Sequence, residues 1–124
     1  MDAAALIHRE LTERVIGAFY DTYNELGFGF LESVYESAFA CELDDLGIRA
    51  QRQHPIVVRF RSHVVGEFRA DLLIEDLLLV EIKSAQVLLP IHEAQLLNYL
   101  KATGITLGLL VNFGPRPQFR RLVL

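Results

Sequence analysis

Three charged residues stand close together in the middle of the sequence, within a stretch that is otherwise apolar. Glu81 and Lys83 end the run 77–83, and Asp71 precedes Glu81 by ten residues. In a strand, side chains two residues apart point to the same face, so Glu81 and Lys83 can act on one object. A carboxylate at the end of a buried strand is destabilising by several kcal/mol unless a cation or hydrogen bonds compensate it. We therefore expect a metal ion or Lys83 to be the partner of Glu81.

Whether Asp71 joins Glu81 depends on the register of the hairpin between them. A two-residue turn at residues 75–76 would pair Asp71 with Val80 and place the two carboxylates on opposite faces. A three-residue loop or a bulge would instead place Asp71 opposite Glu81, with side chains about 5 Å apart, a distance that one ion can bridge. We predict the second register.

The chemistry of this pair is that of a hard divalent ion. Two carboxylates and a backbone carbonyl, that of Ile82, suit Mg²⁺ or Mn²⁺, which keep several bound waters. Cys41 is the only cysteine, so the sequence has no cluster with the spacing of a zinc site. The ion would activate a water and draw charge from a phosphate oxygen, and Lys83 would orient that water or neutralise charge. This predicts phosphodiester hydrolysis; the alternative is a hairpin whose polar end carries unrelated charges.

Two predicted helices carry further candidates. His92, Gln95 and Tyr99 follow one another at i, i+3 and i+7 and share one helical face. The alternative is a surface histidine and glutamine beside a core tyrosine. Glu32 and Tyr35 share a face one turn apart, so Glu32 would add a carboxylate near the ion or serve only as a favourable charge in a first helical turn.

Apolar periodicity and turn residues predict the elements that position these side chains. Helices are expected over 5–26, with one apolar stripe, and over 31–46, with Gly47 at its end. Alternating β-branched residues then predict an antiparallel meander of three strands, 56–60, 64–74 and 77–84. A third helix opens at Pro90 and runs to 103, and the strands 105–113 and 119–124 follow. The order is ααβββαββ, an α/β fold.

Composition limits the class of protein. With 124 residues and 52% apolar content, the chain is expected to form a single domain over 1–124. It has no apolar run long enough for a membrane span and no leader at its N-terminus, so we expect a cytoplasmic protein without a membrane partner. The net charge is −4, but residues 1–48 hold ten acidic and two basic residues, whereas residues 49–124 hold ten basic and six acidic ones. A polyanion would meet the second part.

The run Gly29–Tyr35 spells G-x-x-E-x-x-Y, and the chain resembles the GxxExxY family, small bacterial and archaeal proteins assigned to the PD-(D/E)XK nuclease superfamily. The resemblance extends over about residues 16–123 and includes the stretches 53–56, 69–73, 80–83, 95–101 and 108–113. It implies a restriction-endonuclease-like fold with a central mixed sheet flanked by helices.

The resemblance also implies roles for the candidate residues. Asp71, Glu81 and Lys83 match the catalytic residues of the superfamily. Gln95 and Tyr99 match the Q-x-x-x-Y element of its RecB-like exonuclease branch, in which the glutamine helps to position substrate or water. Glu32 matches the helical acid that often completes the metal site.

We therefore expect a magnesium-dependent nuclease acting on nucleic acid, first of all DNA. Its metal ligands would be Asp71, Glu81, the Ile82 carbonyl and Glu32; Lys83 and Gln95 would complete the catalytic set, and the residues that position substrate would be Tyr99, Tyr35 and His92. The alternative is a non-catalytic module that binds nucleic acid or protein on the same fold. A homodimer through the edge at 120–124 would enlarge the binding surface of so small a chain.

Overall fold

The computed structural model of the chain describes residues 7–124, so the predicted start of the first helix at residue 5 lies outside the described residues. Within this part the predicted order ααβββαββ is confirmed. The elements are α2 (Arg9–Leu26), α3 (Glu32–Asp45), β1 (Ala50–Phe60), β2 (His63–Ile74), β3 (Leu78–Lys83), α4 (Pro90–Thr103), β4 (Leu107–Phe113) and β5 (Pro117–Val123).

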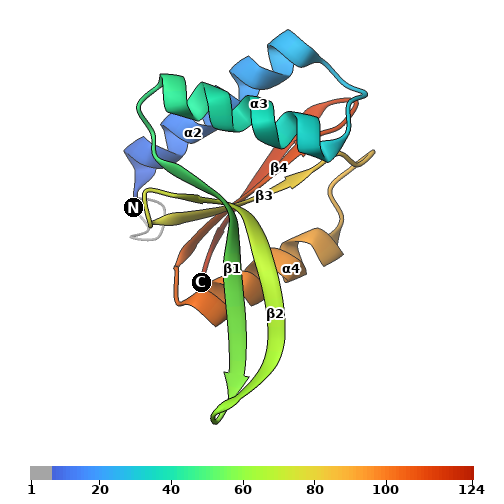
Figure 1. Cartoon of the computed structure of the whole chain (residues 1–124). Coiled ribbons are helices and arrows are strands. Elements are labelled where there is room, and N and C mark those ends of the chain that lie inside the picture. Colours follow the sequence, from blue (N-terminus) through green and yellow to red (C-terminus); the bar gives the residue numbers. More distant parts are fainter. Residues whose placement is uncertain (1–6) are drawn as a thin grey trace.

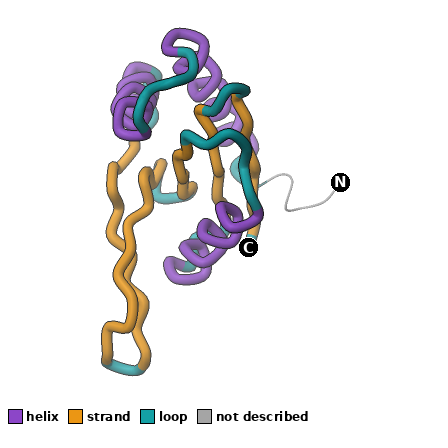
Figure 2. The backbone as a smooth tube through the Cα atoms, turned by 90° about the vertical axis from the view of Figure 1, so that its right-hand side faces the viewer, coloured by secondary structure: helices purple, strands orange, loops and turns teal. Residues whose placement is uncertain are grey.

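The strands form one mixed sheet in the order β1-β2-β3-β4-β5. The predicted antiparallel meander of β1, β2 and β3 is confirmed, whereas β3 and β4 are parallel and are joined by a crossover through α4. Helices α2 and α3 lie on one side of the sheet and α4 lies on the other (Figures 1 and 2). This is the α/β arrangement of a restriction-endonuclease-like fold.

Each face of the sheet has its own apolar core. On the side of α2 and α3, Phe19, Phe39 and Phe113 are wholly buried in a cluster with the sheet. On the other side, Leu96 and Leu100 of α4 pack on the sheet so closely that a Cβ at Gly108 would lie 3.0 Å from the Leu96 side chain. Every residue of β4 is buried, which confirms the prediction of a strand covered on both faces.

The hairpin between β2 and β3 has the predicted register. Glu75 and Asp76 form a turn at positive φ, 52° and 57°, and Leu77 N–H donates to the carbonyl of Ile74 at 2.9 Å. Ladder pairing resumes with Ile74 opposite Leu78, so Leu77 is an extra residue, as in a bulge. The shift of one position brings Asp71 toward Glu81.

Helix α3 buries one narrow apolar stripe. Its buried apolar residues, Tyr35, Phe39 and Leu43, recur every four positions. Val34 and Leu46 lie off this stripe, with 39% and 41% of their surface exposed. Cys41 is also exposed, because two residues beyond Phe39 a helix has turned about 200° away from its buried face.

The first hairpin is much longer than the part of it that joins the sheet. Strand β3 pairs only with the last three residues of β2, Leu72–Ile74, whereas the pairing of β1 with β2 extends from one end of the strands to the other, with interruptions at Gln53 and after Val58. Residues 55–69, here called the hairpin arm, therefore project beyond the sheet, as the lower part of Figure 1 shows. No helix within residues 7–124 is both long and apolar enough to cross a membrane.

Candidate active site

Asp71 and Glu81 lie together where β2 and β3 separate. The ladder between the two strands ends at the pair Leu72–Val80. Beyond it each carboxylate accepts a backbone hydrogen bond from the other strand: Asp71 N–H donates to Glu81 Oε1 at 3.0 Å. Ile82 N–H donates to Asp71 Oδ2 at 2.7 Å. The two carboxylates thus take the place of backbone pairing and are held beside each other.

The same contacts bring the main chain of Ile82 to the site. In a strand, the N–H and C=O of one residue project toward the same neighbour. Because the N–H of Ile82 points to Asp71, its carbonyl also faces the side on which β2 has moved away. This placement is compatible with the predicted role of that carbonyl as a ligand.

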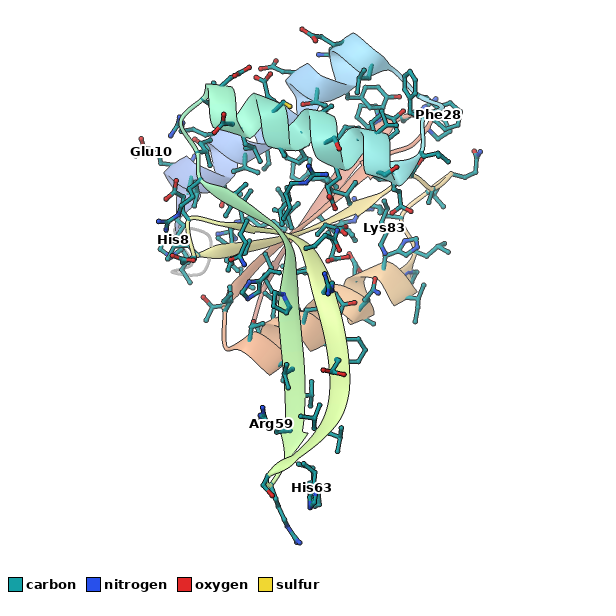
Figure 3. The ribbon with its side chains drawn as sticks, viewed as in Figure 1. His8, Glu10, Phe28, Arg59, His63 and Lys83 are labelled. Carbon is teal, nitrogen blue, oxygen red and sulfur yellow. The ribbon has the colours of Figure 1, made fainter. Side chains whose placement is uncertain are left out.

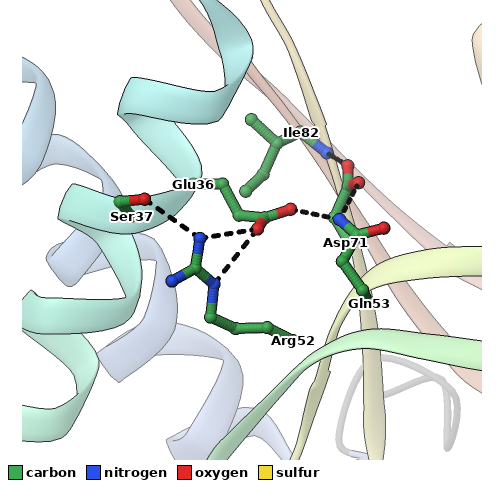
Figure 4. A network of polar contacts seen from close by, with 6 residues as sticks. All are labelled: Glu36, Ser37, Arg52, Gln53, Asp71 and Ile82. Carbon is green, nitrogen blue, oxygen red and sulfur yellow. Dashed lines mark hydrogen bonds and ion pairs between the residues drawn. The ribbon is translucent and has the colours of Figure 1, made fainter.

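Gln53 of β1 is an irregular position of its strand beside Asp71. The residues on either side of it pair regularly with β2, but Gln53 itself is unpaired opposite Asp71 and has φ 52°. Its Nε2 donates to Asp71 Oδ1 at 3.3 Å and to Glu36 of α3 (Figure 4). A non-glycine residue at positive φ is strained, and such strain concentrates at functional sites. Irregular pairing here therefore points the amide of Gln53 into the site.

Glu36 is the helical acid of this hydrogen-bonded network. Arg52 donates two bonds to Glu36 Oε2, at 3.1 and 2.9 Å, and a third to Ser37 Oγ at 3.0 Å (Figure 4). The carboxylate of Glu36 is therefore neutralised by a cation on β1. Sequence reasoning missed it, although its position four residues after Glu32 puts both acids on one face of α3.

A cavity of about 250 Å³ opens beside these groups. It is lined by Glu32, Ser33, Glu36, Gln53, Asp71 and Ile82. The predicted ligand Glu32 thus faces the same space as Asp71. In the part of the chain that the structure describes, however, no group of three or more histidine, cysteine, aspartate or glutamate side chains is arranged to hold a metal ion.

Lys83 reaches α4 rather than a carboxylate. Its Nζ donates to Gln95 Oε1 at 2.8 Å, and Gln95 Nε2 donates to the hydroxyl of Tyr99 at 3.2 Å. Figure 3 shows Lys83 in the opening between α3 and α4. The structure therefore joins three of the predicted residues, Lys83, Gln95 and Tyr99, in one chain of hydrogen bonds. His92 is not in it: its Nδ1 accepts the N–H of Leu89 at 3.0 Å and so caps the start of α4.

The electrostatics of the site favour protonation of its acids. Burial raises the pKa of Glu81 to about 8, and the negative charge of Asp71 acts in the same direction, against the Asp71 N–H bond and Lys83. Burial also raises the pKa of Asp71 above its ordinary value, opposed mainly by the bond from Ile82. Burial is the first cause of both shifts, and nearby negative charge adds to it, from Glu36 at Asp71 and from Asp71 at Glu81.

The surroundings of Tyr35 give no support to its predicted role in positioning substrate. Its side chain is wholly buried and stacks on Phe113, with ring centroids 4.3 Å apart. Its hydroxyl donates to the carbonyl of Gly27 and accepts the N–H of Phe30 at 3.2 Å. Tyr35 therefore fixes the loop before α3, and its polar atom is not available to a substrate.

Asn112 fixes the chain just beyond Lys83. It is wholly buried at the end of β4, and its side-chain amide makes two bonds of 2.9 Å with the N–H and the carbonyl of Ala85. A Cβ on the following Gly114 would lie 2.2 Å from that carbonyl, so only glycine allows this approach. The pair holds the loop that follows β3, and with it the end of the strand that carries Lys83.

The donor set fits a hard divalent cation. All the candidate ligands are oxygen atoms, of Asp71, Glu81, Glu32 and the Ile82 carbonyl, which is the set that Mg²⁺ and Mn²⁺ prefer. A positive ion between Asp71 and Glu81 would favour their charged forms and so oppose the burial that raises both pKa values. Because the described carboxylates do not converge as a group of three, water would have to complete the coordination.

Comparisons with known proteins concern the fold and the family of the chain. None of the curated proteins matches the chain. A solved structure described as "Crystal structure of SSO0001" shares the fold, with a TM-score of 0.58 and 20% sequence identity. That match covers 74% of this chain and 50% of that one, so the chain spans half the length of this structural relative. A model of the PD-(D/E)XK nuclease superfamily matches residues 9–122. The chain therefore belongs to the PD-(D/E)XK nuclease superfamily.

Proposed function

We propose that the chain is a divalent-metal-dependent nuclease that hydrolyses phosphodiester bonds in DNA. The superfamily suggests nuclease activity and a nucleic-acid substrate. One set of contacts carries the finer proposal. The Glu81 carboxylate accepts the N–H of Asp71, and the Asp71 carboxylate accepts the N–H of Ile82. Lys83, on the same strand as Glu81, is held by Gln95. We infer that a phosphate would bind between these acidic oxygens and the ammonium group of Lys83.

Each residue of this set has a distinct role. Asp71 and Glu81, with the Ile82 carbonyl and Glu32, would hold Mg²⁺ or Mn²⁺, which supplies an acidic water and a Lewis acid for the phosphate. Lys83 donates hydrogen bonds to the attacking water or to the phosphate oxygens as negative charge develops. Gln95 keeps the ammonium group of Lys83 in place, and Tyr99 orients the amide of Gln95.

We also propose the finer relationships that the sequence implied. The run Gly29–Tyr35 supports membership of the GxxExxY family, and the bond between Gln95 and Tyr99 supports the RecB-like branch, because it joins the two residues of the Q-x-x-x-Y element. Residues 1–124 would act as one nuclease-like domain. The cytoplasmic location and the homodimer stay predictions.

The alternative is a module that binds nucleic acid or protein without cutting it. The absence of three converging carboxylates in the described residues favours this alternative. The raised pKa values of Asp71 and Glu81 favour the nuclease, because an enclosed pair of acids is unfavourable unless a ligand compensates it. Metal binding separates the two: only the nuclease needs an ion that depends on both carboxylates.

The test is hydrolysis of labelled single-stranded DNA and of plasmid DNA with Mg²⁺ or Mn²⁺. We expect cleavage by the wild type, loss of cleavage in Lys83→Ala and in the presence of EDTA, and no loss in Arg9→Ala, whose exposed side chain pairs with Glu13 on α2. Titration calorimetry should detect ion binding that Glu81→Gln abolishes. Equal and negligible cleavage by wild type and Lys83→Ala, without ion binding, would sink the proposal and favour the module.

A further inference from the structure

The hairpin arm, residues 55–69, exposes apolar side chains on a ribbon of only two strands. Beyond Leu72, β2 has no second neighbour among the described strands, and β1 is at the edge of the sheet. A two-stranded hairpin has little stability of its own, so a conspicuous apolar surface on it needs another explanation. Phe60 near the tip is 58% exposed and Val65 is 61% exposed. Exposure of this kind marks a surface that contacts a partner.

The charges on and beside the arm show what kind of partner it fits. Among the described residues, four cations in this region make no ion pair: Arg59, Arg61, Arg69 and Lys101. Other cations of the chain are paired with acids, namely Arg9, Arg49, Arg52 and Arg120. The arm itself holds one acid, Glu67. A polyanion that also presents flat apolar groups complements such a surface, and a nucleic acid with unpaired bases is one.

A groove runs between the arm and α4. It has a volume of about 380 Å³ and is lined by Val57, Val58, Arg59, Asn98, Lys101 and Ala102. Two of the unpaired cations, Arg59 and Lys101, thus face the same space from opposite walls. In Figure 3, Arg59 lies well along the arm, away from Lys83. The groove is therefore separate from the carboxylate cavity and is basic where that cavity is acidic.

Helix α4 connects the groove to the candidate active site. Asn98 and Ala102 follow Gln95 at i+3 and i+7 and share its helical face. One stripe of α4 therefore runs from Gln95, which binds Lys83, into the groove. Along the axis, Gln95 and Lys101 are about 9 Å apart, the span of a few nucleotides of one strand. The arm also touches the helix between them, since the rings of Phe68 and Tyr99 lie 5.7 Å apart.

We propose that a single strand of nucleic acid, bound at Asp71 and Glu81, continues along α4 into the groove, where Arg59 and Lys101 bind its phosphates. Phe60, whose ring already carries the Arg61 guanidinium 4.9 Å from its centroid, stacks on a base near the tip of the arm. Stacking of this kind requires unpaired bases, which is why the occupant is a single strand and not a duplex. This inference rests on the nuclease function proposed above.

Binding without metal tests the groove independently of catalysis. The anisotropy of a labelled single-stranded DNA in EDTA is measured against salt for wild type, Arg59→Ala/Lys101→Ala and the control Arg9→Ala/Arg49→Ala. The control removes the same charge from exposed ion pairs elsewhere. We expect the groove variant to reduce the steepness of the log–log plot of the binding constant against salt concentration by about 1.4, because it loses contacts with two phosphates. The control should leave the slope unchanged. Phe60→Ala should weaken binding about tenfold without a change of slope.

Hydrolysis of a small substrate separates the groove from the active site. With Mn²⁺ and bis(p-nitrophenyl) phosphate, which is too small to reach the groove, the groove variants should match wild type. If neither wild type nor any variant hydrolyses this substrate, the proposed nuclease function fails. The salt slopes of binding would still decide whether the groove binds nucleic acid. Equal salt slopes for Arg59→Ala/Lys101→Ala and for the control would overturn the proposal that the groove binds phosphates. So would a groove variant that loses binding to duplex DNA but keeps binding to single-stranded DNA.

Discussion

Replacement of Glu81 by glutamine should change how the stability of the metal-free protein depends on pH. Glu81 is 4% exposed, and its pKa is raised from 4.5 to about 8. Because the folded pKa is above the unfolded one, the folded protein holds more protons between these values. The stabilisation from this group is fully present below pH 4.5 and is lost as pH rises through about 8.

The size of the effect follows from the number of protons. Between about pH 5.5 and 7.5 the folded state holds nearly one extra proton, so the free energy of unfolding should fall by about 1.4 kcal/mol per pH unit. Glutamine does not titrate, yet it keeps an oxygen that can accept the Asp71 N–H. Asp71, whose pKa is also raised, contributes a slope of the same sign to both proteins. The difference between the two curves therefore isolates Glu81.

Urea unfolding followed by circular dichroism, in EDTA at several pH values from 5 to 8, measures that difference. The stability of Glu81→Gln relative to wild type should increase with pH by about 1.4 kcal/mol per unit, reaching several kcal/mol by pH 8. Glu10→Gln, an exposed acid in the first turn of α2, should run parallel to wild type. Parallel curves for wild type and Glu81→Gln would show that Glu81 ionises normally and would refute the reasoning. Mg²⁺ should flatten the wild-type curve only.

Three further changes test the elements around the site. Asn112→Ala removes both bonds to Ala85. It should lower the free energy of unfolding by about 1–3 kcal/mol in urea and slow cleavage in a nuclease assay. Unchanged stability would contradict this prediction. Tyr35→Phe should be destabilising by a similar amount, about 1–3 kcal/mol, but leave cleavage per folded molecule unchanged, and a selective loss of activity would restore its role at the substrate. Gln95→Ala should reduce kcat by about 10–100-fold with little change in KM, because Lys83 loses the hydrogen bond that positions it. Gln95→Glu keeps an oxygen acceptor for Lys83 and should recover part of the rate. Equal rates in the two variants would contradict this prediction.

The elements were predictable because each has a local signal. The stripe on α2, the proline that opens α4 and the apolar run of β4 depend on neighbours in sequence, and local chemistry fixed them within a few residues. The register of the β2–β3 hairpin was predicted by a functional argument, namely that Asp71 and Glu81 must meet. The turn at Glu75 and Asp76, both at positive φ, has no sequence signal as strong as glycine, so propensity alone would not have selected it.

The network around Gln53 could not be predicted because it depends on contacts across the fold. Glu36, Gln53 and Asp71 come from α3, β1 and β2, and only the packing of α3 over the sheet brings them together. The same packing decides the orientation of α3, which buries Tyr35 and turns Cys41 outward. A periodic pattern gives the direction of a helical face but not which neighbour it meets.

This network also distinguishes the two acids of α3, Glu32 and Glu36, that line the cavity with Asp71. The amide of Gln53 donates to Glu36 and to Asp71 at once, so an N–H group lies where a cation would be attracted by both acids. Arg52 already neutralises Glu36, which leaves Glu32, without a hydrogen bond among the described contacts, as the helical acid free to approach an ion. We therefore propose Glu32 as the helical acid of the ion site, because Glu36, one turn away on α3, is held by Arg52, whereas Glu32 is exposed.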